Sequence, residues 1–244
     1  MASKDTDTDT DTHAQTQTHA PSPSPPPRTA RGSPVAVAGA EVGAVVGAAV
    51  VGPGLQRLWS DRVVRGADAV LIPAISELLE AVPNLDAVAV TVGPGAFTSL
   101  RVGVATALGF AMSRGVDVVC VSSLEARAAM VPGERVLALL DARKSRVYAQ
   151  TFNTKLGTAL TEAEDAPLES VLPEAPFVAV GEGIKLGPEV IVGAGGTLAP
   201  NSDRSPAVAV ARIGRERRAD AVPPHAVALA YLRGADAKTL AERR

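Results

Sequence analysis

The segment from residue 93 to residue 101 (GPGAFTSLR) has residue types and a spacing that suit anion binding. It follows residues 86–92 (DAVAVTV), a β-branched apolar run with the length of a buried strand. A glycine turn between a strand and a helix exposes backbone N–H groups, and these groups and the helix dipole attract negative charge. The candidate phosphate-binding residues are Gly93, Gly95 and Thr98. A tight turn without a ligand explains the same residues, and we favour it because glycine turns outnumber ligand sites.

The chain lacks the residues that several other common kinds of catalytic or binding site need. No Gly-Lys-Ser/Thr follows the glycine turn, which excludes a P-loop nucleotide site. Of the three histidines, His13 and His19 lie in a low-complexity tail, which leaves His225 alone in the folded part. Catalytic zinc needs three protein ligands, and a catalytic Ser or Cys needs a nearby base. We therefore expect no metal, no cofactor and no histidine-based catalysis.

The composition indicates a folded region preceded by a tail. Residues 1–34 are Asp-Thr, Gln/Thr/His and Ser-Pro repeats that cannot bury enough apolar surface to fold, so we expect them to be dispensable. Hydrophobic residues make up 46% of the chain and aromatic residues only 3%, which favours parallel strands covered by helices. The single cysteine, Cys120, lies in the apolar run 116–121 and is predicted to be a core residue.

Charge and hydropathy limit the partners and the location. The net charge of −2 gives no general attraction to nucleic acid or to a membrane, so any contact with nucleic acid must be local or come from a partner. The dense basic run 212–218 is interpreted as the solvated face of a late helix. No apolar run reaches membrane-spanning length and the first residues lack the pattern of a secretory signal. We expect a cytoplasmic protein without a membrane association.

The elements that must position the glycine turn follow a recognisable order. Two hairpin strands over residues 35–51 and a third strand at 55–59 precede a helix over 67–82. A strand at 86–92, a helix capped by Thr98 or Ser99, a strand at 116–121 and a helix opening at Ser122 or Ser123 follow. Three antiparallel strands and then alternating helices and strands give the ribonuclease H topology of the actin-like or Hsp70-like ATPase fold, an α/β class.

A second, smaller half follows the first. We divide the chain into a tail (1–34), an N-terminal ribonuclease H-like half-domain (35–133) and a C-terminal half-domain (134–244). The second half is predicted to hold the following strands, loop and helix: strands 135–140, 146–152 and 177–180, a loop at 193–201 and a helix at 205–218. The turn after Asp141, in the run LLDARKSRVY, suits a side-chain cap or a salt bridge better than a ligand contact.

Several motifs in the same order resemble one known family. Residues 93–111 (GPGAFTSLRVGVATALGFA) resemble the signature of the bacterial TsaB (YeaZ) family, in which a Gly-Pro-Gly turn opens a helix of small residues. Residues 121–126 (VSSLEA), 140–148 (LDARKSRVY) and 231–233 (YLR) are similar to further family motifs. The resemblance extends from about residue 35 to residue 238 and implies an actin-like fold in a non-catalytic relative of TsaD.

Two departures from the family pattern remove polar groups from one cleft. The family has Asp-Thr-Ser at the tip of its first strand, where this chain has Ala38, and Glu41 replaces the aspartate only after a shift of register. The family's His-Ser-Glu corresponds here to residues 67–69, which begin with Ala67. Both departures argue against nucleotide hydrolysis, and against nucleotide binding, by this chain.

The signature helix is apolar nearly all round, so it must be buried on more than one side. Burial inside the chain and burial under a partner are both open from the residues alone. The resemblance favours a partner, because TsaB-like proteins pair with TsaD through helices of this half. The expected interface residues are Leu71, Ile75, Leu100, Gly103, Val104, Ala107 and Ala111.

The resemblance implies a scaffold that supports a TsaD-like catalytic subunit, with a TsaE-like ATPase, in forming N6-threonylcarbamoyladenosine beside the tRNA anticodon. Contact with tRNA would then be indirect, through the complex. Two alternatives stay open: an independent actin-like kinase or ATPase whose glycine turns at Gly93 and Gly181 hold phosphates, and a degenerate stand-alone homodimer.

Overall fold

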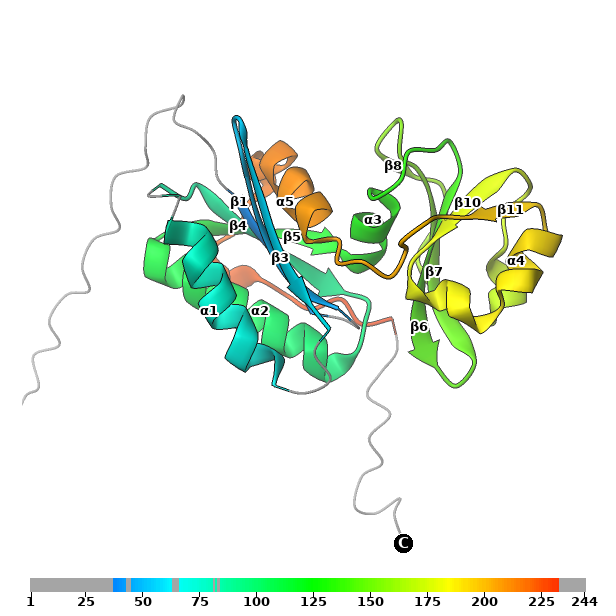
Figure 1. The fold of residues 1–244 in the computed structure, drawn as a ribbon, viewed down its shortest axis with the longest axis horizontal. Coiled ribbons are helices and arrows are strands. Elements are labelled where there is room, and N and C mark those ends of the chain that lie inside the picture. The colour runs from blue at the N-terminus through cyan, green and yellow to red at the C-terminus, as the bar shows by residue number, and fades with distance from the viewer. Residues whose placement is uncertain (1–36, 43–44, 63–65, 81, 83, 233–244) are drawn as a thin grey trace, which may run out of the picture.

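The computed structural model describes residues 37–42, 45–62, 66–80, 82 and 84–232. Two α/β halves lie next to each other, each built on one mixed sheet (Figure 1). The predicted tail, residues 1–34, lies outside the described residues. The fold class expected from the pattern is confirmed.

The first half has the predicted ribonuclease H topology. Its sheet has the order β3-β2-β1-β4-β5, with β1 antiparallel to β2, β2 antiparallel to β3, and β1, β4 and β5 parallel. Its strands are β1 (Val37–Val42), β2 (Val46–Gly52), β3 (Leu55–Asp61), β4 (Ala87–Gly93) and β5 (Asp117–Ser122). Its helices are α1 (Ala67–Glu80), α2 (Phe97–Arg114) and α3 (Ser123–Ala128).

The second half is built on a sheet of order β11-β10-β6-β7-β8, with β9 also paired to β7. Its elements are β6 (Val136–Arg143), β7 (Arg146–Asn153), β8 (Thr158–Ala159), β9 (Glu164–Ala166), the 3-10 turn η1 (Leu168–Val171), β10 (Phe177–Val180), η2 (Glu182–Leu186), α4 (Pro188–Gly193) and β11 (Gly196–Leu198). The loop predicted for residues 193–201 is wrong, because Gly196 to Leu198 pair with β10. A strand of three residues is too short to show a periodic pattern.

The chain then returns to the first half, which differs from the division predicted at residue 134. Helix α5 (Ala207–Glu216) contacts β1, β2 and β4 on the sheet face opposite α1 and α2 (Figure 1). After two 3-10 turns, η3 (Arg218–Asp220) and η4 (Pro224–Ala226), the last described residues run back to the glycine turn. Val222 pairs with Val118 of β5, and the Ala230 N–H donates to the Val92 carbonyl at 2.8 Å. We call residues 222–232 the C-terminal strap.

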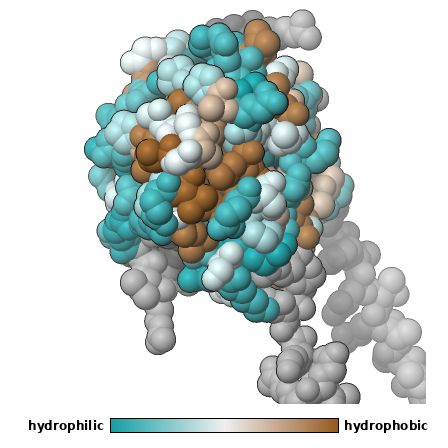
Figure 2. Space-filling model, turned by 90° about the vertical axis from the view of Figure 1, so that its right-hand side faces the viewer, coloured by the Kyte–Doolittle hydropathy of each residue, from teal (hydrophilic) through white to brown (hydrophobic). Residues whose placement is uncertain are grey.

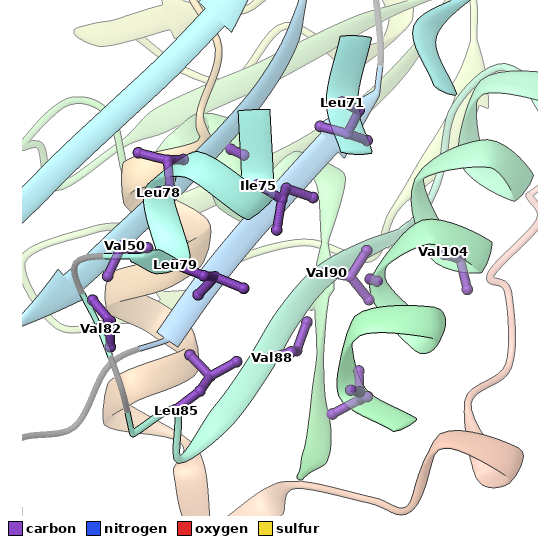
Figure 3. Packing of buried hydrophobic residues seen from close by; sticks show 14 of the residues in the cluster. Val50, Leu71, Ile75, Leu78, Leu79, Val82, Leu85, Val88, Val90 and Val104 are labelled. Atoms are coloured by element: carbon purple, nitrogen blue, oxygen red, sulfur yellow. The ribbon is translucent and has the colours of Figure 1, made fainter. Parts of the chain in front are cut away.

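The main core lies between the first sheet and helices α1 and α2. Leu71 and Ile75 of α1, Val104 of α2 and the strand residues Val88 and Val90 belong to one cluster, which is labelled in Figure 3. All five side chains are buried. Burial of this kind contributes about 1.5–3 kcal/mol for each large aliphatic side chain. The two helices are therefore fixed to the sheet, and the glycine turn between β4 and α2 has a defined position.

A buried arginine joins the two halves. Arg127 of α3 is 1% exposed, donates to the Arg204 carbonyl and lies 3.3 Å from the Glu182 carboxylate of η2. A buried charge is tolerated only when it is paired and hydrogen-bonded. Arg127 therefore ties α3 to the second half and to the segment that leads into α5.

Candidate functional site

Helix α2 begins directly after the glycine turn, at Phe97. Its N-cap is Ala96, which has no side-chain hydrogen bond, so the prediction that Thr98 or Ser99 caps the helix is wrong. Both residues lie inside the first helical turn. The corresponding prediction for α3 is confirmed, since the Ser122 hydroxyl accepts the Glu125 N–H at 3.4 Å.

Position 93 requires glycine, because another part of the chain's backbone lies very close to it. Its φ is +126°, and a Cβ at this position would lie 2.1 Å from the Ala230 carbonyl oxygen. The strap therefore packs directly against the turn that the sequence offered as a phosphate loop. Gly95 has ordinary contacts with Leu100, and Thr98 is exposed. The turn-without-ligand interpretation agrees with this geometry.

The second glycine turn is packed in the same way. Gly181 has a φ of +108°, and a Cβ there would lie 2.1 Å from the Leu139 carbonyl oxygen of β6. A Cβ at Gly183 would lie 2.9 Å from the Leu139 carbonyl carbon. Both turns that a phosphate-binding kinase would use therefore serve close packing between strands and the following segments.

Two motifs far apart in the sequence meet beside the first glycine turn. The rings of Phe97 and Tyr231 stack with centroids 5.4 Å apart, and the Arg101 guanidinium lies 3.7 Å from the Phe97 ring centroid. Arg101 Nε also donates to the Tyr231 hydroxyl at 3.4 Å. We call these three residues the aromatic cluster. Sequence reasoning noted both motifs but gave no signal that they touch, because 130 residues separate them.

The expected partner interface lies inside the chain, which is a correction. Residues of α1 and α2 that the sequence offered as a contact stripe pack against the sheet or against each other. Six are at most 6% exposed and Gly103 is also buried: Leu71, Ile75, Leu100, Gly103, Val104, Ala107 and Ala111. The small residues at 103, 107 and 111 let α2 approach its own sheet, so they cannot contact a partner.

The opposite side of α2 is exposed and still apolar. Ala105 and Gly109 are exposed, Val102 is half-buried, and Met112 is 71% exposed. Ile72 of the neighbouring helix α1 is 49% exposed. We call these five residues the outer helix face. Sequence reasoning missed this face because a helix that is apolar nearly all round gives no sign of which side meets the sheet.

The first-strand residues are placed differently from the prediction. Ala38 is the second residue of β1 and pairs with Val88, so it is not at the strand tip. Glu41 lies near the carboxyl end, opposite Gly47 of β2, and not in the hairpin turn. Ala67 is the first residue of α1. Residues 38–40 of the strand (AGA) include no carboxylate that could replace the family's aspartate.

The remaining candidates are Asp141, His225 and Cys120, and in the described part of the chain they form no metal-binding group. The Asp141 carboxylate accepts the Arg143 N–H at 2.7 Å, as expected for a turn cap. His225 is exposed in η4, and no group of three His, Cys, Asp or Glu in the described residues could hold a metal. Cys120 is half-buried in β5, and burial raises the pKa of its thiol.

Within the described ranges, no helix is long and apolar enough to cross a bilayer.

Comparisons with known proteins agree with the motif resemblance. Residues 65–181 match the family model described as TsaD, tRNA N6-adenosine threonylcarbamoyltransferase. An uncharacterized protein of Mycobacterium leprae is 41% identical over 78 residues, which cover 32% of this chain and 21% of that protein. The tRNA threonylcarbamoyladenosine biosynthesis protein TsaB of Haemophilus influenzae is 36% identical over 86 residues, covering 32% of this chain and 36% of that protein.

The fold is that of a solved relative. The structure of YeaZ from Pseudomonas aeruginosa superposes with a TM-score of 0.68 and 22% identity, over 82% of this chain and all of that one. The comparisons thus agree with the resemblance to the TsaB (YeaZ) family, and the chain has the fold of YeaZ. The chain spans only about a fifth to a third of the length of the curated relatives that it matches.

Proposed function

We propose that this TsaB-like chain is a non-catalytic subunit that binds a TsaD-like catalytic subunit during formation of N6-threonylcarbamoyladenosine on tRNA. The family model over residues 65–181 and the similarity to a TsaB support the pathway. A TsaE-like ATPase completes the proposed complex, which works in the cytoplasm. Bond formation belongs to the TsaD-like partner.

Close packing at the two glycine turns, Gly93 and Gly181, supports the proposal that the chain is non-catalytic. The Ala230 carbonyl of the strap occupies the side of the turn where a Cβ of Gly93 would stand, so a phosphate that approaches from this side has to displace the strap. Departure of the strap breaks the Ala230 hydrogen bond to Val92 and exposes Val227 and Leu229, which pack against the main core. A nucleotide that approaches from this side must therefore compete with an internal contact.

The outer helix face supports the partner part. Its members Val102, Ala105, Gly109 and Met112 recur at intervals of three and four residues, which places them in one row along α2. Ala105 and Gly109 allow another helix to approach closely, while Met112 and Ile72 supply apolar area. This geometry suits a helix pair of a partner subunit packed on α1 and α2.

The test is binding of the full chain to the TsaD-like protein of the same cell. Ala105→Arg places a charge in the middle of the row, and we expect at least about a tenfold loss of affinity with unchanged thermal unfolding. Ala159→Arg adds the same charge to an exposed alanine of β8 and serves as the control. Equal affinity of both variants would show that the outer helix face is not the interface.

The same samples test the two alternatives. An ATP-hydrolysis assay of the isolated chain is expected to show no enzyme-like rate, and activity that Glu41→Gln abolishes would favour the kinase alternative. Sedimentation of the chain alone tests the stand-alone homodimer. If Ala105→Arg dissociates a homodimer while the TsaD-like protein does not bind the original chain, the proposed partner is wrong.

A further inference from the structure

A groove runs between the β2–β3 turn and the last turns of α5. Its volume is about 650 Å³. The residues that shape its rim are Gly52, Gly54, Gln56, Arg212, Arg215 and Glu216. Apart from Val51, which lines the groove and is buried, the lining residues are half-buried or exposed, so the groove is open to solvent along its length. An open groove suits a polymer backbone better than an enclosed small molecule.

The structure separates the arginines of the basic run 212–218 into two pairs. Arg217 donates to the Glu125 carboxylate at 2.8 Å, and Arg218 lies 3.7 Å from the Asp86 carboxylate. These two arginines fix the end of α5 to the first half. Among the residues that the structure describes, no ion pair is found for Arg212 or Arg215, and both line the groove.

The geometry of the two groove arginines suits phosphate. Residues 212 and 215 are three positions apart on α5, so their side chains leave the helix on one side. Arg212 Nη2 donates to Gln56 Oε1 at 2.7 Å, which holds the guanidinium over the groove and leaves its other donors available. Planar guanidinium groups bind phosphate oxygens with two parallel hydrogen bonds.

The opposite rim lets a ligand approach closely. Gly52 and Gly54 carry no side chains, and a Cβ added at Gly54 would meet no atom within 4 Å. The exposed Glu216 carboxylate is the one acidic group among the lining residues. The lining therefore keeps a net positive charge although the whole chain has a net charge of −2. A local positive charge of this kind can attract nucleic acid even though the net charge of the whole chain is negative.

We propose that the groove between the β2–β3 turn and α5 binds phosphates of an RNA backbone, with Arg212 and Arg215 as the contacting residues. The inference rests on the proposed function, in which the complex acts on tRNA. Helix α5 covers the sheet face opposite α1 and α2 (Figure 1). RNA in the groove and a partner on the outer helix face therefore occupy opposite sides of the first half and do not compete.

The experiment measures binding of a fluorescent, unmodified tRNA transcript to the full chain at several salt concentrations. The double variant Arg212→Gln with Arg215→Gln is expected to weaken binding by about tenfold or more at 50 mM salt. Loss of two phosphate contacts should reduce the slope of log affinity against log salt by about 1.4 to 1.8. Glu216→Gln should strengthen binding. Arg114→Gln, at the end of α2 on the opposite layer, is the matched control and should change neither quantity.

Competition with inorganic phosphate and with ATP distinguishes the sources of phosphate. If phosphate and ATP displace the transcript only at concentrations high enough to raise the ionic strength, the result supports binding of an RNA backbone. Displacement by micromolar ATP would assign the groove to a nucleotide and overturn the proposal. No binding of the original chain, or equal binding of the double variant, would also overturn it. Because TsaD is absent from this assay, its outcome is independent of the Ala105→Arg test.

Discussion

Gly109 offers a direct test of which side of α2 faces outward. It lies in the interior of α2, it is exposed, and a Cβ added to it would meet no atom within 4 Å. Glycine in a helix interior costs about 0.5–1 kcal/mol relative to alanine, because glycine loses more backbone entropy on folding. Gly109→Ala should therefore stabilise the isolated chain by about 0.5–1 kcal/mol. For a chain of this size, that gain raises Tm by roughly 1–4 °C.

The assay is thermal unfolding of the full chain followed by circular dichroism. Gly93→Ala is the opposite control: its φ is +126° and its new Cβ would lie 2.1 Å from the Ala230 oxygen, so it should lower Tm. If Gly109→Ala lowers Tm, the residue packs against something inside the chain and our assignment of the outer helix face is refuted. An unchanged Tm would refute the helix-propensity argument.

The same variant also reports on the proposed partner. If a helix of the TsaD-like subunit approaches closely at Gly109, an added methyl group is tolerated poorly and a larger side chain more so. Gly109→Trp should leave the isolated chain folded, since its side chain points into open space. We expect this variant to lose affinity by about tenfold or more, whereas Ala107→Trp, whose side chain is buried, should unfold the chain.

Three further predictions concern contacts inside the chain. Arg127→Met should lower the free energy of unfolding by about 3 kcal/mol in urea titration, because it removes the buried partner of Glu182; a variant as stable as the original would contradict this pairing. The raised pKa of Cys120 leaves less thiolate at neutral pH, so iodoacetamide should react more slowly with the folded chain than with the urea-unfolded chain, and equal rates would refute it. Tyr231→Ala removes a ring stacked on Phe97 and should cost about 0.5–1.5 kcal/mol, seen as faster hydrogen exchange at the start of α2, whereas Tyr231→Phe should keep most of the protection.

Figure 2 shows an apolar area on the end of the second half, the side that carries α4 and β11 in Figure 1. Leu186, just before α4, is 43% exposed, and Val192 within α4 is 56% exposed. A change of either residue to a charged one is not expected to affect the contacts of the first half. These positions therefore provide surface controls for the binding experiments.

The order of elements in the first half could be predicted from local sequence patterns. Alternating apolar runs predicted three antiparallel strands and then helices between parallel strands, and the sheet order β3-β2-β1-β4-β5 follows from these connections. The cap at Ser122 was readable because an N-cap needs only a local side chain and a nearby backbone N–H. Local signals thus predicted the topology and, through several motifs in order, the resemblance to the TsaB (YeaZ) family.

Which surfaces are free depends on contacts that exist only in the folded chain. The residues of α2 are apolar on every side, and contact with the sheet, not the helix pattern, places Ala107 inside and Ala105 outside. The glycine turn looked suitable for phosphate until the strap, more than a hundred residues later, placed the Ala230 carbonyl against it. Contacts between distant residues depend on the path of the whole chain, and a pattern read over one or two helical turns carries no information about that path.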